Sequence, residues 1–126
     1  LGQENVTSSN DPLIINNTAN DDIATGNVRV TGLDLIGEVT SSSTIGANNF
    51  TVDIDAGGSP PAECTAGTEL VNATATGITS SVLPAGNRSA SLGSEELYVC
   101  FRKVPSGLSP QAYSTLNGTA WTVSVV

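Results

Sequence analysis

Hydrophobic and polar residues alternate with a period of two in several stretches of this chain, and clusters of glycine, proline and asparagine separate these stretches. This alternation is typical of strands that bury one face, and turn residues at this spacing are typical of an all-β sandwich. No stretch has the period of a convincing helix. The pattern predicts an all-β fold, a single Ig-like antiparallel β-sandwich of seven or eight strands. Because no boundary interrupts it, we expect one domain over residues 1–126.

The expected strands are residues 12–17, 27–35, 49–55, 68–76, 78–84, 96–104 and 119–126. The segment 96–104 carries apolar residues on both faces, as a central strand does. An extended N-terminal arm is expected over 1–11, and 37–49 should be an exposed connection because it is a low-complexity stretch.

Buried positions follow from the same alternation. Val28 and Val30 should face a core, followed by Leu33 and Leu35 beyond a bend at Gly32. The next strand should direct Phe50, Val52 and Ile54 inward, with Thr51, Asp53 and Asp55 outward. Aromatic residues Trp121 and Tyr113 are also expected in the core.

Composition indicates an exported protein. The 126 residues include no Met, so we expect that Leu1 follows a removed signal peptide and that the protein is extracellular or at the cell surface. No apolar run approaches the length of a membrane span, so we expect no membrane insertion in this form. The net charge is −8 with only four basic residues, which argues against nucleic acid or an anionic membrane face as a partner.

Export changes the interpretation of the two cysteines. Cys64 and Cys100, alone in an exported chain, favour a disulfide over a metal pair or a redox couple. We expect the bridge to join two strands near the core. Closing a loop of this size stabilises a fold by roughly 4 kcal/mol in the chain-entropy model.

Catalytic chemistry is poorly represented. The chain has no His, so an imidazole base, a conventional Ser–His relay and a His metal ligand are excluded. Adjacent acids such as Glu95 and Glu96 point to opposite faces of a strand. Asp53 and Asp55 share a face, but no glycine-spaced ligand loop surrounds them, which favours a solvated polar face over a calcium site. We expect no enzyme, no metal and no cofactor.

Six N-x-Ser/Thr triplets are candidate sites of N-glycosylation: Asn5, Asn16, Asn49, Asn72, Asn87 and Asn117. A surface rich in Ser, Thr and Asn also generates such triplets by chance. Asn16 falls in an expected strand, and Asn117-Gly has the character of a tight turn. Asn49, Asn72 and Asn87 lie at or beside expected loops, so these three are predicted to carry covalent glycans.

Tyr98 and Cys100 have the spacing of the tyrosine corner of immunoglobulin domains. The only Trp follows both cysteines instead of lying between them, and Ser94 stands where the usual Asp would be. These departures exclude a true immunoglobulin domain. Most of the chain, from "PLIINNTANDDI" through "ELYVCFRKVPSGLSPQAYS" to "WTVSV", resembles small secreted archaeal Ig-like surface proteins. The resemblance implies a subunit that polymerises as a pilus or thread by lending a strand to its neighbour, or a part of a surface layer or adhesin.

The terminal segment "AWTVSVV" has none of the Lys, Pro or bulge by which edge strands avoid association. It should therefore pair fully, either within its own domain or in a groove of a neighbour, with Trp121, Val123 and Val125 as the assembly residues. The N-terminal arm is a rival donor. The leading hypothesis is a structural subunit of an extracellular glycosylated filament or surface layer, built from copies of itself. The alternative is a monomeric or cell-attached module that binds glycans or proteins.

Overall fold

The computed structural model describes residues 4–7, 13–55, 66–81, 83–86, 93–115 and 119–126, with backbone alone at 4–7 and Asp55. These residues form an all-β protein with one short 3-10 helix, and no helix among them is long and apolar enough to cross a membrane. The elements in chain order are β1 (Glu4–Thr7), β2 (Leu13–Asn16), β3 (Val28–Thr31), β4 (Leu35–Gly37), β5 (Thr44–Ile45), η1 (Ala47–Asn49), β6 (Phe50–Asp55), β7 (Thr68–Glu69), β8 (Ala75–Gly77), β9 (Ser94–Lys103), β10 (Tyr113–Ser114) and β11 (Thr122–Val125).

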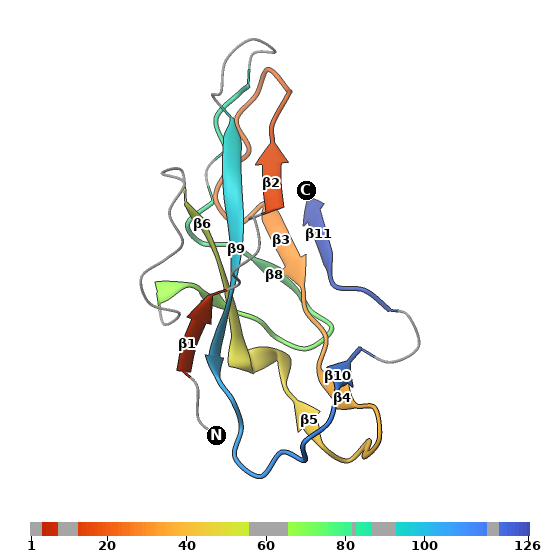
Figure 1. The fold of residues 1–126 in the computed structure, drawn as a ribbon. Helices are drawn as coiled ribbons and strands as arrows, with labels where there is room; N and C mark the ends of the chain where they lie inside the picture. Colours follow the sequence, from red (N-terminus) through yellow and green to blue (C-terminus); the bar gives the residue numbers. More distant parts are fainter. Residues whose placement is uncertain (1–3, 8–12, 56–65, 82, 87–92, 116–118) are drawn as a thin grey trace.

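These strands form three antiparallel sheets (Figure 1). In the first, called the β9 sheet, β1 and β2 pair with successive halves of one edge of β9, while β6 and then β7 follow on its other edge. The second, the β3 sheet, has the order β11-β3-β8. A third small sheet has the order β10-β4-β5. Every pairing is between antiparallel strands, as hairpins and crossing connections of an all-β chain allow.

The ten-residue strand β9 is the centre of its sheet, as its two apolar faces predict. Leu97 and Val99 lie on the face that contributes to the hydrophobic core. Tyr98 and Cys100 lie on the opposite face and are also buried, with exposed fractions of 5% and 2%. A strand that is covered on both faces has apolar residues at consecutive positions, because neither of its faces is exposed to solvent.

The β9 sheet and the β3 sheet supply side chains to one common core. Val28 and Val30 come from β3, and Val52, Ile54 and Leu97 come from β6 and β9. The connecting segments add Ala47, Leu70, Ile78 and Leu83. Each fully buried aliphatic side chain contributes about 1.5–3 kcal/mol to stability. Two sheets that share one core are consistent with a β-sandwich.

Gly32 breaks the expected strand 27–35 into β3 and β4, as predicted for a bend. A Cβ at this position would lie 2.8 Å from Cδ1 of Leu70, and the carbonyl of Gly32 accepts a hydrogen bond from the amide of Ala73. The bend therefore needs the close approach that only glycine permits. Leu33 and Leu35, beyond it, are half-buried.

Three local expectations were wrong. The expected strand 68–76 is two short strands, β7 and β8, separated by a turn closed by the amide of Thr74 on the carbonyl of Val71. The described residues of 78–84 form no strand, and Leu83 makes an isolated bridge with Ile23. The segment 37–49 was expected to be exposed, yet Ile45 and Ala47 are buried. Contacts with the core determine the structure of these short segments, and the alternation pattern does not encode such contacts.

The N-terminal segment also differs from a free arm, because β1 pairs with β9 from Glu4↔Lys103 to Thr7↔Cys100. Cys100 is 2% exposed on the face of β9 opposite to Leu97 and Val99, and it is not a free thiol. Its expected partner Cys64 lies outside the described residues. The Cys64–Cys100 disulfide thus stays a prediction.

Asn17 holds the turn after β2 against the bridge at Leu83. It is 4% exposed, and its Nδ2 donates to the carbonyl oxygens of Asp21, Leu83 and Pro84 at 2.9, 3.3 and 3.1 Å. Its Oδ1 accepts from the amide of Ala19 at 3.0 Å. A buried amide whose donors and acceptor are all used resists replacement, since any change leaves buried partners unsatisfied.

We therefore predict that Asn17→Asp lowers the free energy of unfolding by about 3 kcal/mol or more, because it places a carboxylate against three carbonyl oxygens. Asn16→Asp is the matched control. Asn16 is exposed on β2, and its change should stay within about 0.5 kcal/mol. Urea denaturation of unglycosylated protein measures both, and equal effects at the two positions would contradict the role assigned to Asn17.

Candidate functional site

The terminal strand pairs within its own chain, the first of the two expected alternatives. β11 lies antiparallel to β3 from Thr122↔Thr31 to Val125↔Val28. It forms one edge of the β3 sheet, and no described strand pairs with its other edge. As it is described here, β11 is not a detached donor strand.

Trp121 belongs to its own domain. Its indole Nε1 donates to the carbonyl oxygen of Leu33 at 3.0 Å, and its ring meets Phe50 edge to face with centroids 5.1 Å apart. Phe50 in turn stacks on Phe101 at 4.6 Å. The half-buried Trp121 thus anchors β11 to the core. This position agrees better with the predicted core role of Trp121 than with its predicted role as an assembly contact.

Val123 and Val125 face the core side of the β3 sheet but remain exposed. Residues directly opposite in an antiparallel pair point to the same face, and the partners Val30 and Val28 are 2% and 0% exposed. Val123 and Val125 are nonetheless 38% and 47% exposed. Part of the core-facing surface of the β3 sheet is therefore exposed.

The β9 sheet has the same feature at β2. Leu13 lies opposite Leu97 and shares its core-side face, yet Leu13 is 55% exposed and Leu97 is 4% exposed. β7 contacts β8, so β2 and β11 are the strands at the other, open side of the two sheets. No ladder joins β2 to β11 among the described strands.

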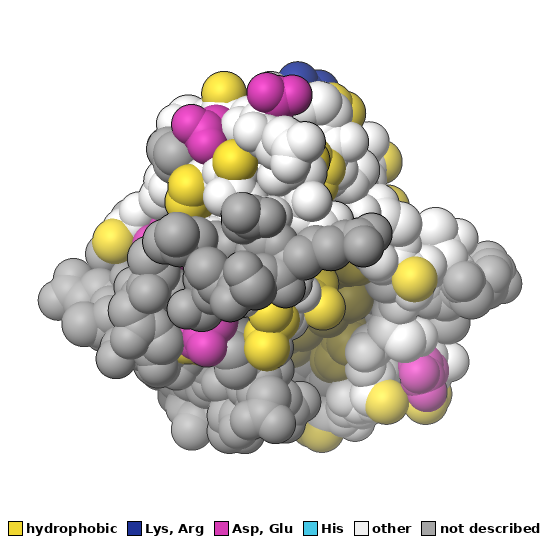
Figure 2. All heavy atoms as spheres, turned by 90° about the horizontal axis from the view of Figure 1, so that it is seen from above, with side chains coloured by type: hydrophobic (Ala, Val, Ile, Leu, Met, Phe, Trp, Pro, Cys, Tyr) yellow, Lys and Arg dark blue, Asp and Glu magenta, His cyan; other side chains and the backbone are white. Residues whose placement is uncertain are grey.

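We call the surface of Leu13, Val123 and Val125 the open flank. Figure 1 draws its two strands, β2 and β11, on the same side of the molecule. Seen from above that view, Figure 2 shows a hollow in the surface with hydrophobic side chains inside it. Side chains that face a core but are not covered by it mark a place where a further strand can bind.

The backbone of β11 is also available at this edge. The amide of Val126 donates to the carbonyl of Asn27 on the β3 side, and amides alternate in direction along a strand. The amides and carbonyls of Val123 and Val125 therefore point toward the free edge. The sequence TVSV of β11 contains no Lys or Pro to block it.

Three of the six predicted glycosylation sites have described side chains. Asn16 is exposed on β2, Asn72 is exposed in the turn between β7 and β8, and Asn49 is half-buried at the end of η1. Asn5 lies on β1, where the backbone alone is described, and Asn87 and Asn117 lie outside the described residues.

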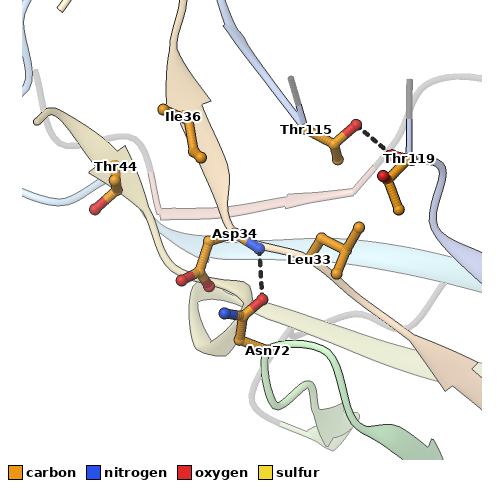
Figure 3. A pocket seen from close by; sticks show the side chains of 7 residues that line it. All are labelled: Leu33, Asp34, Ile36, Thr44, Asn72, Thr115 and Thr119. Atoms are coloured by element: carbon orange, nitrogen blue, oxygen red, sulfur yellow. Dashed lines mark hydrogen bonds between the residues drawn. The ribbon is translucent and has the colours of Figure 1, made fainter. Parts of the chain in front are cut away.

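A second feature is a surface pocket of about 370 Å³ beside the Gly32 bend (Figure 3). It is lined by Leu33 and Ile36, by three threonines and by the polar pair Asp34 and Asn72. The amide of Asp34 donates to Oδ1 of Asn72 at 3.0 Å, and Oδ1 of Asp34 accepts from the amide of Ala47 at 2.7 Å. No sequence pattern predicted this pocket, because its walls come from segments far apart in the chain.

Metal and catalytic groupings do not emerge from the described residues, which contain no cluster of three or more His, Cys, Asp or Glu that could hold a metal. The carboxylate of Asp53 accepts hydrogen bonds from Ser80 Oγ and from the amide of Ile54. Glu95 is buried and Glu96 binds the hydroxyl of Tyr98, so these adjacent acids lie on opposite faces as expected. Comparison with protein-family models, curated proteins and solved structures finds no match to this chain.

The exposure of the flank predicts unequal effects at two opposite valines. Val28→Ala should lower the free energy of unfolding by about 2 kcal/mol or more, since it opens a cavity in a packed core. Val125→Ala, directly across the ladder, should cost below about 1 kcal/mol because this side chain is already half in water. Denaturant unfolding of the monomer compares them. Equal losses would show that the flank is covered within the chain.

Proposed function

We propose that this protein is a structural subunit of an extracellular, glycosylated filament or surface layer, and that it assembles by β-strand complementation between copies of itself. In this proposal the β9 and β3 sheets are the two halves of an Ig-like sandwich. The open flank is the surface that a neighbouring subunit completes. The resemblance of the chain to secreted archaeal surface proteins points in the same direction.

The open flank is the observation that carries the proposal. It combines a free strand edge with apolar side chains on the core side of both sheets, and soluble monomers normally avoid this combination. A strand of a neighbouring copy that pairs with β11 would cover Val123 and Val125 and reach Leu13 on the facing sheet. A strand donated from a different surface of the neighbouring copy makes the contact heterologous, and repetition without closure then produces a filament.

The energetics indicate how much the neighbour has to cover. Val123 and Val125 each offer one amide and one carbonyl to the free edge, about four hydrogen bonds in all, and each contributes roughly 0.5–1.5 kcal/mol net. Association costs an estimated 4–15 kcal/mol in lost freedom, so backbone pairing alone is marginal. The three flank side chains are 38–55% exposed, so their further burial adds about half of the 1.5–3 kcal/mol that full burial is worth. A stable contact therefore requires the neighbour to cover surface beyond these three residues.

A pair of charge substitutions on adjacent residues of β11 tests this proposal. Val125→Glu places a carboxylate on the core-side face of the flank and should leave the protein as a folded monomer. Ser124→Glu adds the same charge to the opposite face, across from Arg29, and should assemble like the unaltered chain. Negative-stain electron microscopy and light scattering measure assembly, and circular dichroism confirms folding.

Two results would contradict the proposal. One is an unaltered protein that stays monomeric at high concentration, which would favour a monomeric binding module. The other is a folded Val125→Glu protein that assembles as readily as Ser124→Glu, because assembly would then use another surface.

The Cys64–Cys100 disulfide is part of the same proposal, since an exported subunit gains stability from a cross-link. Non-reducing peptide mapping should recover the two cysteines in one linked fragment, and reduction should lower the unfolding free energy by roughly 2–5 kcal/mol. Recovery of both residues as alkylated thiols would show that no bridge forms.

A further inference from the structure

The turn that contains Asn72 is fixed to the β3–β4 bend. The amide of Ala73 donates to the carbonyl of Gly32 at 2.8 Å, and the amide of Thr74 donates to the carbonyl of Val71 at 3.1 Å. Ala73 has a φ of 55°, a left-handed conformation that non-glycine residues adopt only when surrounding contacts require it. Asn72 is therefore presented at a defined place on the surface.

The side chain of Asn72 is oriented with its nitrogen unused. Its Oδ1 accepts the amide of Asp34, and no described residue accepts a hydrogen bond from its Nδ2. N-glycosylation forms its bond at Nδ2 and keeps the carbonyl oxygen. A glycan can therefore be attached to Asn72 without loss of the bond to Asp34.

Asn49 offers a contrast within the same protein. Its Nδ2 donates to the carbonyl of Gly46 at 3.1 Å and to Oδ1 of Asn48 at 3.3 Å, and the acceptor triplet ends at Thr51, which is 2% exposed. Both hydrogens of the nitrogen are in use. The folded chain thus favours Asn72 over Asn49 as a glycan carrier, although the sequence predicted both.

Asn72 and Asp34 together border two hollows. One is the pocket of about 370 Å³ described above, and the other, of about 310 Å³, lies toward Gly46 and Val71. Figure 3 shows the nitrogen of Asn72 on the side where the Asp34 carboxylate and Thr44 lie. A group attached to this nitrogen therefore begins beside Asp34, which borders both hollows.

We propose that Asn72 carries an N-linked glycan whose first sugar residue lies in the pocket beside Asp34, so that the glycan forms part of the folded surface. This inference rests on the proposed function only in that the chain is exported and glycosylated. It does not depend on assembly through the open flank.

The lining of the pocket suits a sugar. A pyranose has apolar C–H faces and a rim of hydroxyls, and pockets that bind such ligands combine apolar walls with a few placed polar groups. Leu33 and Ile36 supply apolar wall, and Thr44 supplies a hydroxyl group. The Asp34 carboxylate, besides accepting from Ala47, can accept a charge-assisted hydrogen bond from a sugar hydroxyl.

The test uses two substitutions at the third residue of the acceptor triplet. Thr74→Ser keeps the triplet Asn-Ala-Ser, whereas Thr74→Ala removes it and leaves Asn72 in place. Both full chains are produced in a host that performs N-glycosylation and in a host that does not. Peptide mapping by mass spectrometry then gives the occupancy of Asn72 in each protein.

Thermal unfolding and NMR give the position of the sugar. From the glycosylating host, Thr74→Ser should unfold at a temperature about 3–5 °C above Thr74→Ala, a shift that a modest stabilisation produces in a domain of this size. From the other host the difference should be smaller, because only the side chain at residue 74 then differs, whose hydroxyl donates to the carbonyl of Asn72 at 3.2 Å. The comparison between hosts isolates the contribution of the glycan. Nuclear Overhauser contacts should join the first sugar to methyl groups of Ile36 and Thr44.

Each contrary outcome has its own meaning. An occupied Asn72 with no thermal shift and no contact to Ile36 or Thr44 would overturn the seating of the sugar and leave the proposed function intact. Sugar at other triplets with Asn72 bare would overturn the choice of Asn72. A chain without any glycan, from a host that glycosylates other secreted proteins, would overturn both this inference and the glycosylation in the proposed function.

Discussion

The pairing of β9 along both of its edges is the constraint on which the rest of the structure depends. One edge holds β1 and β2 in succession, and the other holds β6. The same strand directs Leu97 into the shared core and buries Tyr98 on its opposite face. Backbone hydrogen bonds and apolar burial thus converge on ten residues. Removal of this strand would leave β1 and β2 without a pairing strand and β6 paired only with β7.

The two sheets differ at their two sides in the placement of their outer strands. At one side β7 and β8 come into contact, while at the other β2 and β11 each carry core-side residues that remain partly exposed. In the proposed assembly, a second subunit would cover this open flank.

Polar residues fix the positions that the apolar core leaves undetermined. Asn17 ties the β2 turn to the bridge at Leu83, and Asn72 ties the β7–β8 turn to the bend at Gly32 through Asp34. Side-chain amides do this well because one group donates and accepts at the same time. Of these two asparagines, only Asn72 keeps its nitrogen unused by described residues, which separates a structural asparagine from a candidate carrier of a glycan.

The sequence by itself determined the all-β class, the central strand around Leu97 and the burial of Val28 and Val52, because alternation and apolar runs are local properties of the chain. The tertiary structure alone decided that β11 pairs with β3, that β1 and β2 share one edge of β9, and that Asp34 meets Asn72. These features depend on which distant segments become neighbours. Period-two alternation assigns residues to faces, but it does not state which strand lies beside which, and so it could not distinguish a covered flank from an open one.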